Sequence, residues 1–261
     1  MRLTRWIMLG CLVLACVGLV SCSKKTPDPN DAGDSSQTST PDKTTGGAVA
    51  VSVKGQAEAA AGGLVPLPVT LPKPQFAGTP TNLDGVENLE PPLGKDRPAF
   101  LAPSDVTNVA LDKTVTALMD PPIMGELSQI VDGDKEATED GLVDLGPMKQ
   151  WVQVDLGEPQ ELWAILFWHF HKQSRVYYDV VVQVADDPDF ITNVRTLFNN
   201  DHDNTSGLGV GSDKNYIDTS EGKLVDAKKE VAQYVRLYSS ENNLNDRSHY
   251  LEVEVYGRTP K

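Results

Sequence analysis

Cysteine is almost missing from this chain. The sequence of 261 residues has three cysteines, and all of them lie within the first 22 residues, at positions 11, 16 and 22. The rest of the chain can therefore form no disulfide framework, no thiolate metal site and no cysteine nucleophile. Its length is sufficient for a packed core, so the fold needs no disulfide.

Basic residues are also scarce. The chain has 23 lysines and arginines against 37 acidic residues, which gives a net charge of −14. Residues 1–103 are balanced, with nine charges of each sign, so the whole excess falls in residues 104–261. An acidic domain cannot neutralise phosphates, which argues against nucleic-acid binding and against a basic lipid-binding patch.

Catalytic sequence motifs are absent as well. The chain contains no Gly-x-Ser-x-Gly motif and no His-Glu-x-x-His motif, which mark serine hydrolases and one class of zinc hydrolase. We therefore expect a protein that is not an enzyme.

The N-terminal residues have the pattern of an export signal. Arg2 and Arg5 precede residues 7–20, a stretch without charge. As a helix, this stretch would span roughly 21 Å, short of the ~30 Å hydrocarbon core of a bilayer. A positive segment before a short apolar stretch indicates a signal peptide, predicted here over residues 1–21.

Residues 19–22, Leu-Val-Ser-Cys, resemble the lipobox of bacterial lipoproteins. The resemblance implies that the thiol of Cys22 is acylated and that cleavage makes Cys22 the new N-terminus. It also implies a membrane-anchored protein of the bacterial cell envelope. Because Ser23 rather than aspartate follows, the outer membrane is expected where the host has one. An ordinary signal peptide, or a short anchor helix in which Cys22 is incidental, is the alternative.

Residues 22–103 have the composition of a tether. Twelve of the eighteen prolines fall in this part, together with glycine runs such as Gly46-Gly47. Such a sequence does not easily form a packed core, so we expect a disordered tether that contributes little to folding. Residues 64–76 alternate proline with apolar residues, which suits either an extended strip on the domain surface or free linker.

Residues 104–261 have the pattern of an all-β domain. Short segments rich in β-branched and aromatic residues are separated by turn signals, and residues 126–131 allow one helical turn at most. The predicted strands cover residues 151–156, 163–170, 176–184, 194–198, 234–238 and 250–256. This spacing predicts an antiparallel β-sandwich or jelly roll.

The landmarks of residues 105–258 resemble those of a discoidin domain. They are the segment 108–115, the loop Val131-Asp-Gly-Asp134, residues 151–157 and the final segments 235–238 and 252–257. The resemblance implies a galactose-binding-like jelly-roll β-sandwich. Members of this family bind sugars, phospholipid headgroups or proteins, so the fold does not fix the ligand.

The loop around Asp132 is a candidate calcium site. Two carboxylates separated by glycine can face the inside of one tight loop, where hydroxyl and main-chain oxygens complete the six to eight ligands of Ca²⁺. The resemblance implies a second contribution from the last strand. The candidate ligands are Gln129, Asp132, Asp134, Thr138, the carbonyl of Leu251, and Glu252. Calcium there would be structural. A plain turn in which Asp132 caps main-chain amides is the alternative.

Two segments are candidates for a binding rim. As strand residues, His169 and His171 would lie on one face, and Arg175 matches an arginine position of fucose-binding relatives. The second segment, residues 198–211, concentrates amide, carboxylate and imidazole groups that suit hydroxyl-rich ligands. Its candidate ligand-binding residues are Asn199, Asp201, His202 and Asp203.

Other uses of these residues stay open. The His-x-His spacing also fits zinc, with His249 as a more doubtful addition to His169, His171 and His202. Residues 201–205 imitate the start of a calcium loop, but glycine is displaced by one position. A polar loop held by its own hydrogen bonds is the third interpretation.

The sequence therefore predicts a surface-tethered, non-catalytic module that binds carbohydrate or glycan. A structural or adhesive module that docks another protein is the alternative; exposed Phe190 or Tyr216, or residues 64–76 as partner, would favour it. A metal-dependent hydrolase that uses the histidines is a third hypothesis.

Overall fold

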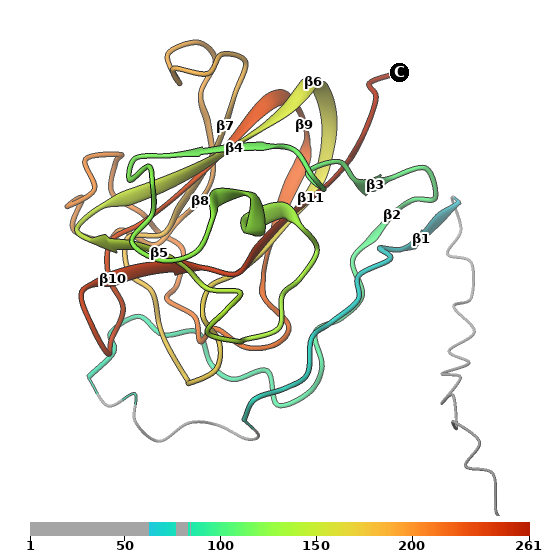
Figure 1. Ribbon diagram of the computed structural model, residues 1–261. Coiled ribbons are helices and arrows are strands. Elements are labelled where there is room, and N and C mark those ends of the chain that lie inside the picture. Colours follow the sequence, from blue (N-terminus) through green and yellow to red (C-terminus); the bar gives the residue numbers. More distant parts are fainter. Residues whose placement is uncertain (1–62, 77–82, 84) are drawn as a thin grey trace, which may run out of the picture. The chain divides into compact units, whose positions relative to one another are not determined.

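The computed structural model describes residues 63–76, 83 and 85–261 (Figure 1). The predicted signal peptide, the predicted lipidation site at Cys22 and the first part of the predicted tether lie outside the described residues. Among the residues that are described, no helix has the length and apolar character needed to cross a membrane.

The regular secondary structure of the described residues consists almost entirely of antiparallel strands. They are β1 (Leu64–Pro66), β2 (Leu101–Pro103), β3 (Thr107–Asn108), β4 (Thr114–Ala117), β5 (Val143–Pro147), β6 (Gln150–Trp168), β7 (Val181–Ala185), β8 (Arg195–Asn199), β9 (Lys223–Ser239), β10 (Arg247–Tyr250) and β11 (Glu252–Arg258). A 3-10 helix, η1 (Leu127–Val131), is the single helical turn that the sequence allows. The predicted all-β, antiparallel fold class is confirmed.

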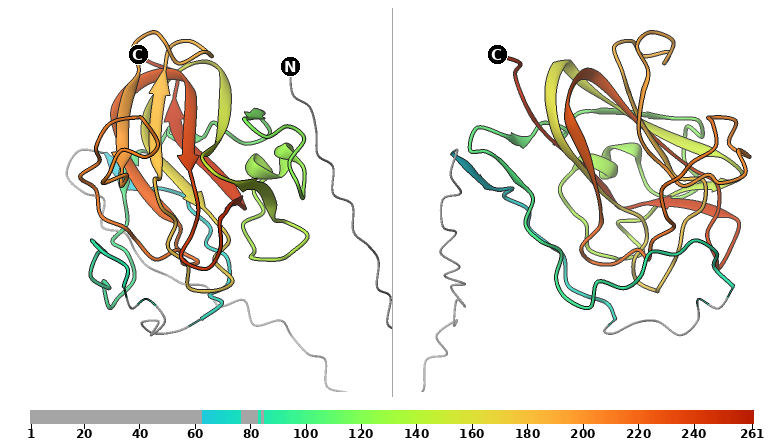
Figure 2. Two further views of the ribbon diagram at one scale, coloured as in Figure 1. Left: turned by 90° about the vertical axis from the view of Figure 1, so that its left-hand side faces the viewer. Right: turned by 180° about the vertical axis from the view of Figure 1, so that it is seen from behind.

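The two longest strands, β6 and β9, pass from one layer of the sandwich into the other. Their mutual pairing shifts register between Asp155 and Gln160 and again after Leu162. Close to the second shift, Lys228 of β9 has a φ of 53°. Register shifts of this kind increase the twist and let a strand turn a corner between layers. The two strands curve side by side in all three ribbon views (Figures 1 and 2).

The remaining strands extend the two layers. The first half of β6 pairs with β4, and the last part of β9 continues to β7 and β8. The second half of β6 pairs with β11, which carries β3 on its other side. The sheet order β3-β11-β6-β9-β7-β8 therefore bends into two facing layers, and the pair β5–β10 forms a separate small sheet.

The main core fills the space between the layers. Alternate residues of each strand point inward, as the two-residue period of a strand requires. Val154 and Phe167 of β6, Val182 of β7, Val235 of β9 and Val253 of β11 are all fully buried there.

A second hydrophobic cluster lies on the opposite face of β6 and β11. It includes Trp163, Leu166, Trp168 and Tyr256. Because this face is covered too, residues 162–168 of β6 are buried on both sides of the strand. Strands buried on both faces have a continuous apolar sequence rather than an alternating one.

Residues 64–76, which we call the surface strip, provide part of that cover. Leu64, Leu67 and Val69 pack against the second cluster together with Phe100. Strand β1 pairs with β2 over three residues, and the amide of Leu67 donates to the carbonyl of Phe100 at 2.9 Å. The sequence left open whether this segment is a surface strip or free linker, and the structure has it on the surface.

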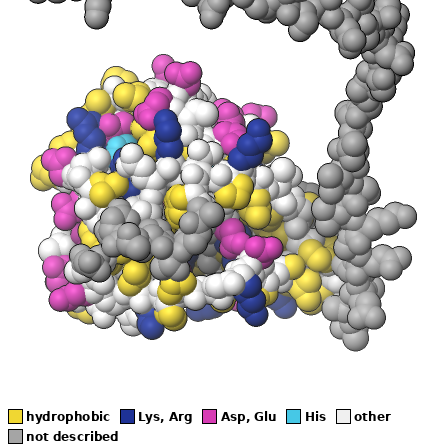
Figure 3. Space-filling model, turned by 90° about the horizontal axis from the view of Figure 1, so that it is seen from below, with side chains coloured by type: hydrophobic (Ala, Val, Ile, Leu, Met, Phe, Trp, Pro, Cys, Tyr) yellow, Lys and Arg dark blue, Asp and Glu magenta, His cyan; other side chains and the backbone are white. Residues whose placement is uncertain are grey.

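Arg97 holds the following segment to the same side of the domain. Its guanidinium donates to the carbonyls of Glu221 and Gly222 at 2.8 and 2.7 Å, and its main-chain amide donates to the Glu221 carboxylate at 3.1 Å. Figure 3 shows hydrophobic side chains on the face seen from below, interspersed with charged ones. All described residues belong to one compact unit, so packing on the sandwich begins before residue 104, within the segment predicted as tether.

Candidate functional site

Several loops converge at the end of the sandwich where β6 finishes. The amide of Val180 donates to the Asn200 side chain at 2.6 Å, and the amide of Tyr178 donates to the carbonyl of Glu241 at 2.9 Å. These bonds join residues 176–180 to both the 199–218 loop and the 240–245 loop. Residues 176–180 therefore connect these two loops at this end of the sandwich.

A group of polar side chains lies beside β5 and β10 at this end. This rim cluster consists of Asp144, Arg175, Tyr177, Arg247 and His249. The Tyr177 hydroxyl lies 3.0 Å from Nδ1 of His249, and a guanidinium nitrogen of Arg175 lies 3.5 Å from the same atom. Because guanidinium is only a donor, Nδ1 is the acceptor and the ring proton is on Nε2. That nitrogen faces Asp144 Oδ2 at 4.0 Å.

His249 is held in its neutral form. Burial lowers its pKa to about 4, and the nearby positive charges of Arg175 and Arg247 act in the same direction against the opposite effect of Asp144. A neutral imidazole can accept the hydrogen bond from Tyr177, which fixes the orientation of both rings.

Arg175 is almost completely buried behind this surface. It is 8% exposed, and its guanidinium lies over the Phe170 ring at 5.2 Å. Its Nε has no hydrogen-bond partner within residues 63–76 and 85–261. A buried charged donor without a partner is costly, so a bridging water at this nitrogen would be stabilising.

The outer part of the rim cluster reaches solvent. Arg247 donates to Asp144 Oδ2 at 2.6 Å, and its side chain is 39% exposed while that of Asp144 is 7% exposed. Ile123 and Met124 lie next to this pair, since the amide of Ile123 donates to the carbonyl of Asp144 at 2.8 Å. Both apolar residues are about half exposed. A fixed guanidinium and carboxylate thus adjoin an apolar surface.

The sequence predicted that His169 and His171 lie together on one face at the binding rim. The structure does not place them in this way. His169 is fully buried, lies 3.2 Å from Asp218 through Nδ1 and stacks on Tyr177 at 4.1 Å. His171, also fully buried, lies 3.0 Å from the carbonyl of Lys135 through Nε2. Strand β6 ends at Trp168, so the two-residue period no longer governs where the next side chains point.

The 199–211 loop is held by its own hydrogen bonds. Asn199 accepts the amide of Asp201 at 2.8 Å, and buried Asp201 accepts the amides of Thr205 and Ser206 at 3.1 and 2.9 Å. His202 lies 2.8 Å from the carbonyl of Asp213. This arrangement matches the third interpretation, of a polar loop that holds itself together.

One acidic group in the described part of the chain has metal-ligand proximity. Oxygens of Asp179, Asp201 and Asp203 lie within 4.8 Å of one another. No histidine belongs to a group of this kind among the described residues. The histidines of the described residues therefore do not form the group of ligands that a zinc site needs. The three aspartates themselves could hold a metal ion.

The predicted calcium loop and the last strand do meet. Glu252 accepts the amide of Gly133 through Oε2 at 3.1 Å. Its side chain is fully buried, and Oε1 has no partner within the described residues. Burial raises the pKa of Glu252 to about 9, with Glu254 and Asp132 adding to the effect. An orphaned buried carboxylate oxygen beside a carboxylate-bearing loop fits a hard cation such as Ca²⁺.

The other predicted calcium ligands differ from Glu252 and from one another in burial and in hydrogen-bond partners. Asp132 and Asp134 are exposed, and each accepts a loop amide, from Asp134 and Glu136 respectively. Gln129 accepts the amide of Glu126 through its side-chain oxygen at 2.6 Å, and Thr138 accepts the amide of Gly141 at 3.1 Å. Leu251 is buried next to Glu252 and donates its amide to Trp168. Each retains an oxygen lone pair, but of this set only Glu252 has a buried oxygen that is without a partner among the described residues.

Sequence reasoning missed Asp144, Arg247, Ile123 and Met124. Asp144 stands in Val-Asp-Leu, an alternation that marks a strand, and Arg247 stands two residues before His249 on β10. These signals indicate an edge pair of strands. They do not show that β5 and β10, about a hundred residues apart, place the two charges side by side.

No protein-family model matches the sequence, and no curated protein matches it. Solved structures do match. The chitosan-binding module 1 of a chitosanase/glucanase from Paenibacillus sp. IK-5 is 24% identical, with 57% of this chain and 98% of that chain covered and a TM-score of 0.39. A fucose-binding module of Streptococcus pneumoniae is 19% identical, with 59% and 99% covered and a TM-score of 0.41.

A family 89 glycoside hydrolase from Clostridium perfringens is matched over a small part of its length. It is 20% identical, with 58% of this chain and 15% of that chain covered and a TM-score of 0.43.

Proposed function

We propose that this protein is a non-catalytic carbohydrate-binding module and that the glycan binds at the rim cluster. The observation that carries the proposal is the ion pair between Arg247 and Asp144, which is partly open to solvent beside Ile123 and Met124. The two charged groups supply planar donors and a carboxylate acceptor for hydroxyl groups, and the apolar pair supplies a surface for C–H groups.

The buried half of the cluster supports this assignment. Arg175, Tyr177 and His249 are fixed to one another before any ligand arrives. A preorganised site loses less entropy on binding than a flexible one. The unpartnered Nε of Arg175 adds a donor that gains a partner if ligand or bridging water reaches it.

A glycan array followed by calorimetry tests the proposal. The array includes chitosan and fucose glycans, the ligand classes of the modules compared above. Arg247→Ala should weaken binding roughly tenfold to a hundredfold, because a hydrogen bond to a charged group contributes about 1.5–3 kcal/mol. Arg195→Ala is the matched control, since Arg195 of β8 pairs with Glu230 of β9 and with Asp186, which follows β7, outside the rim cluster.

If Arg247→Ala and Asp144→Asn both bind the selected glycan like the wild type, the glycan site lies elsewhere. If no glycan binds the wild type, the proposed function is wrong. Arg247 is the better first target than Arg175, because substitution of a buried arginine can also disturb folding.

We also propose that Ca²⁺ binds at Glu252 and the loop that carries Asp132. Asp132, Asp134 and Glu252 would supply the carboxylates, and Gln129, Thr138 and the carbonyl of Leu251 are the further candidates. When bound, the ion would displace the proton that the raised pKa keeps on Glu252, pair with the resulting carboxylate and join the loop to β11, so its contribution would be structural.

The N-terminal sequence adds a location to the proposed function. With Cys22 acylated, residues 23 to 62 would link the module to a membrane of the bacterial envelope, the outer one where it exists. Carbohydrate at the cell surface or in its surroundings would then be the partner.

The two alternative functions gain less support. Tyr216 is 2% exposed, and Phe190 is stacked under Arg236 at 4.0 Å, so the two aromatic residues that would favour protein docking are occupied within the domain. The surface strip likewise packs on its own chain. For a metal hydrolase, the histidines would have to converge, and each instead has a separate partner.

A further inference from the structure

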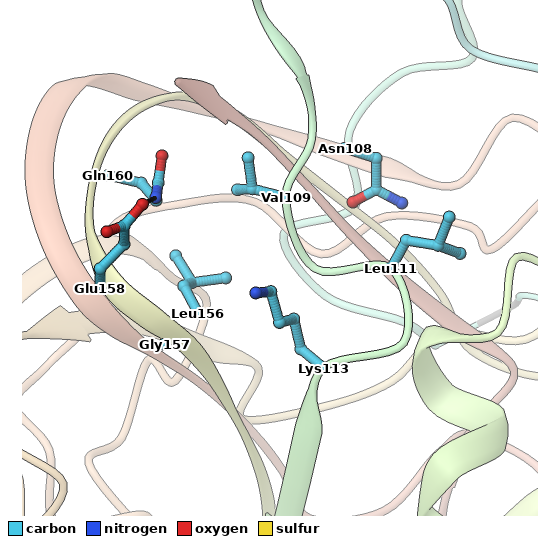
Figure 4. A pocket seen from close by; sticks show the side chains of 8 residues that line it. All are labelled: Asn108, Val109, Leu111, Lys113, Leu156, Gly157, Glu158 and Gln160. Carbon is cyan, nitrogen blue, oxygen red and sulfur yellow. Dashed lines mark hydrogen bonds between the residues drawn. The ribbon is translucent and has the colours of Figure 1, made fainter. Parts of the chain in front are cut away.

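A small pocket lies apart from the rim cluster, between the residues that follow β3 and the bend of β6 (Figure 4). Its volume is about 320 Å³, at the lower end of the range for small-molecule sites, roughly 300–1,000 Å³. One wall is a turn closed by the amide of Lys113 donating to the carbonyl of Ala110 at 3.0 Å. The opposite wall is formed by residues 156–160, where the register of β6 shifts.

The bend of β6 allows the two walls to approach each other. Gly157 has a φ of +85°, a conformation that favours glycine, and a side chain there would begin 3.6 Å from Nζ of Lys113. The positive φ, rather than a lack of space, is what favours glycine at this bend.

Two opposite charges face this pocket without pairing. The side chain of Lys113 extends into it, as Figure 4 shows, and its ammonium makes no hydrogen bond or ion pair with any residue that the structure describes. Across the pocket, Glu158 accepts the side-chain amide of Gln160 through Oε1 at 3.2 Å. Its Oε2 has no partner in the described part of the chain. Gln160 is 6% exposed, so a buried amide orients the carboxylate.

Aliphatic side chains complete the lining. Leu111 is 47% exposed and Val109 is half-buried, and both stand on the wall that carries Lys113, whereas Leu156, at 1% exposure, lies behind the surface. The site thus offers one ammonium, one carboxylate and an apolar surface beside them. Lys113 and Glu158 are both exposed, so a ligand with one charge of each sign can reach and pair with both.

We propose that this pocket binds a small aliphatic zwitterion, a molecule of the α-amino-acid class. The ligand carboxylate would pair with Lys113, the ligand ammonium with Glu158, and the aliphatic group would contact Leu111 and Val109. Hydrogen bonds between ionised groups are the strong ones, so the two pairs together select for both charges. This site does not depend on the glycan proposal.

The test follows the main-chain amide resonances of the full chain by NMR during titration with L-valine. Isobutylamine, which lacks the carboxylate, and isovalerate, which lacks the amine, are the matched analogues. Valine should shift the resonances of Lys113 and Gly157 with saturation in the millimolar range. Each analogue should bind at least tenfold more weakly.

Charge variants separate the pocket from general surface effects. Lys113→Gln and Glu158→Gln should each weaken valine binding tenfold or more, and Lys214→Gln, an exposed lysine outside the pocket, should not change it. The double variant Lys113→Glu with Glu158→Lys should regain binding, because both charges are present in reversed order. The absence of a saturable shift with valine would overturn the proposal, and so would equal binding of valine and either analogue.

Discussion

Glu252 and Gly133 join the last strand to the loop that carries Asp132. The amide of Gly133 donates to Oε2 of Glu252 at 3.1 Å, while Oε1 of the same carboxylate is buried without a partner in the described residues. One oxygen of the Glu252 carboxylate thus joins two residues that are 119 positions apart. The other oxygen is free to bind a cation.

Calcium removal should therefore destabilise the protein. A ligand at 100 times its dissociation constant stabilises the folded state by about 2.7 kcal/mol, so chelation should lower the thermal midpoint by several degrees. Glu252→Gln should abolish the response to calcium, because an amide oxygen without charge replaces the carboxylate. Thermal melts with calcium and with chelator measure the effect.

Glu241→Gln serves as the control, since Glu241 is exposed on a loop outside the proposed site. It should keep the full response to calcium. Equal midpoints with calcium and with chelator for the wild type, and no calcium in metal analysis of the native protein, would contradict the proposed site.

His249 should make the protein sensitive to acid. Its pKa is 6.5 in its ordinary state and about 4 in the folded protein, so the unfolded chain binds its proton first. The stability linked to this residue is present above pH 6.5 and is lost as the pH falls toward 4, by up to about 3 kcal/mol. Asp144 opposes the shift, whereas Arg175, Arg247 and His169 contribute to it.

Urea unfolding across this pH range checks the prediction. A His249→Gln variant can retain a hydrogen bond to Tyr177 but does not titrate, so its stability should fall less steeply with acid than that of the wild type. If the free energy of unfolding fell equally with pH in the two proteins, His249 would not titrate as its surroundings indicate.

The surface strip should contribute to stability. Leu67 packs on the second hydrophobic cluster, so Leu67→Ala should lower the free energy of unfolding by about 1–2 kcal/mol, less than for a fully buried leucine. Val65, in the neighbouring strand position, is 38% exposed and outside the cluster. Val65→Ala should therefore stay within about 0.5 kcal/mol of the wild type. Equal effects of the two substitutions would mean that the apolar contacts of the surface strip do not contribute to the free energy of unfolding.

Cys22 should carry the lipid. Intact-mass measurement of protein from the bacterial envelope should show an acyl addition at Cys22 and loss of residues 1–21. Cys22→Ser should lose the acyl group, and Cys16→Ser, within the apolar run, should keep it. A Cys22→Ser protein that is cleaved at the same bond and remains membrane-bound would rule out the lipoprotein interpretation.

The sequence predicted that several segments form strands, but it did not predict where each strand begins and ends. Residues 151–156 and 163–170 were expected as two strands because Gly157 and Pro159 resemble a turn. Residues 151–156 and 163–168 belong to one strand, β6, and residues 169 and 170 lie beyond its end. A corner between layers uses the same residue types as a turn, so sequence alone does not separate them. The segment 250–256 is divided at Leu251 into β10 and β11, and β9 begins at Lys223, within a charged stretch that hides its alternation.

The candidate site could be predicted only in part. The link between the Asp132 loop and Glu252 could be predicted, because both segments are landmarks of the discoidin resemblance and occur in the expected order along the chain. The histidines were expected at an exposed rim, yet His169 and His171 are fully buried. A polar residue at a strand end has the same sequence signal whether it faces solvent or a buried partner such as Asp218. The pairing of Asp144 with Arg247 depends on tertiary contacts that no local pattern contains.

The pairing of β1 with β2 has a mechanical consequence. A pulling force applied to the chain at residue 63 acts first on β1, which has only three paired residues, and on the apolar contacts of the surface strip. The pair of β6 and β9 lies further along the chain and is joined over 13 residue pairs. We therefore expect the strip to separate from the sandwich at a lower force than the pair of β6 and β9.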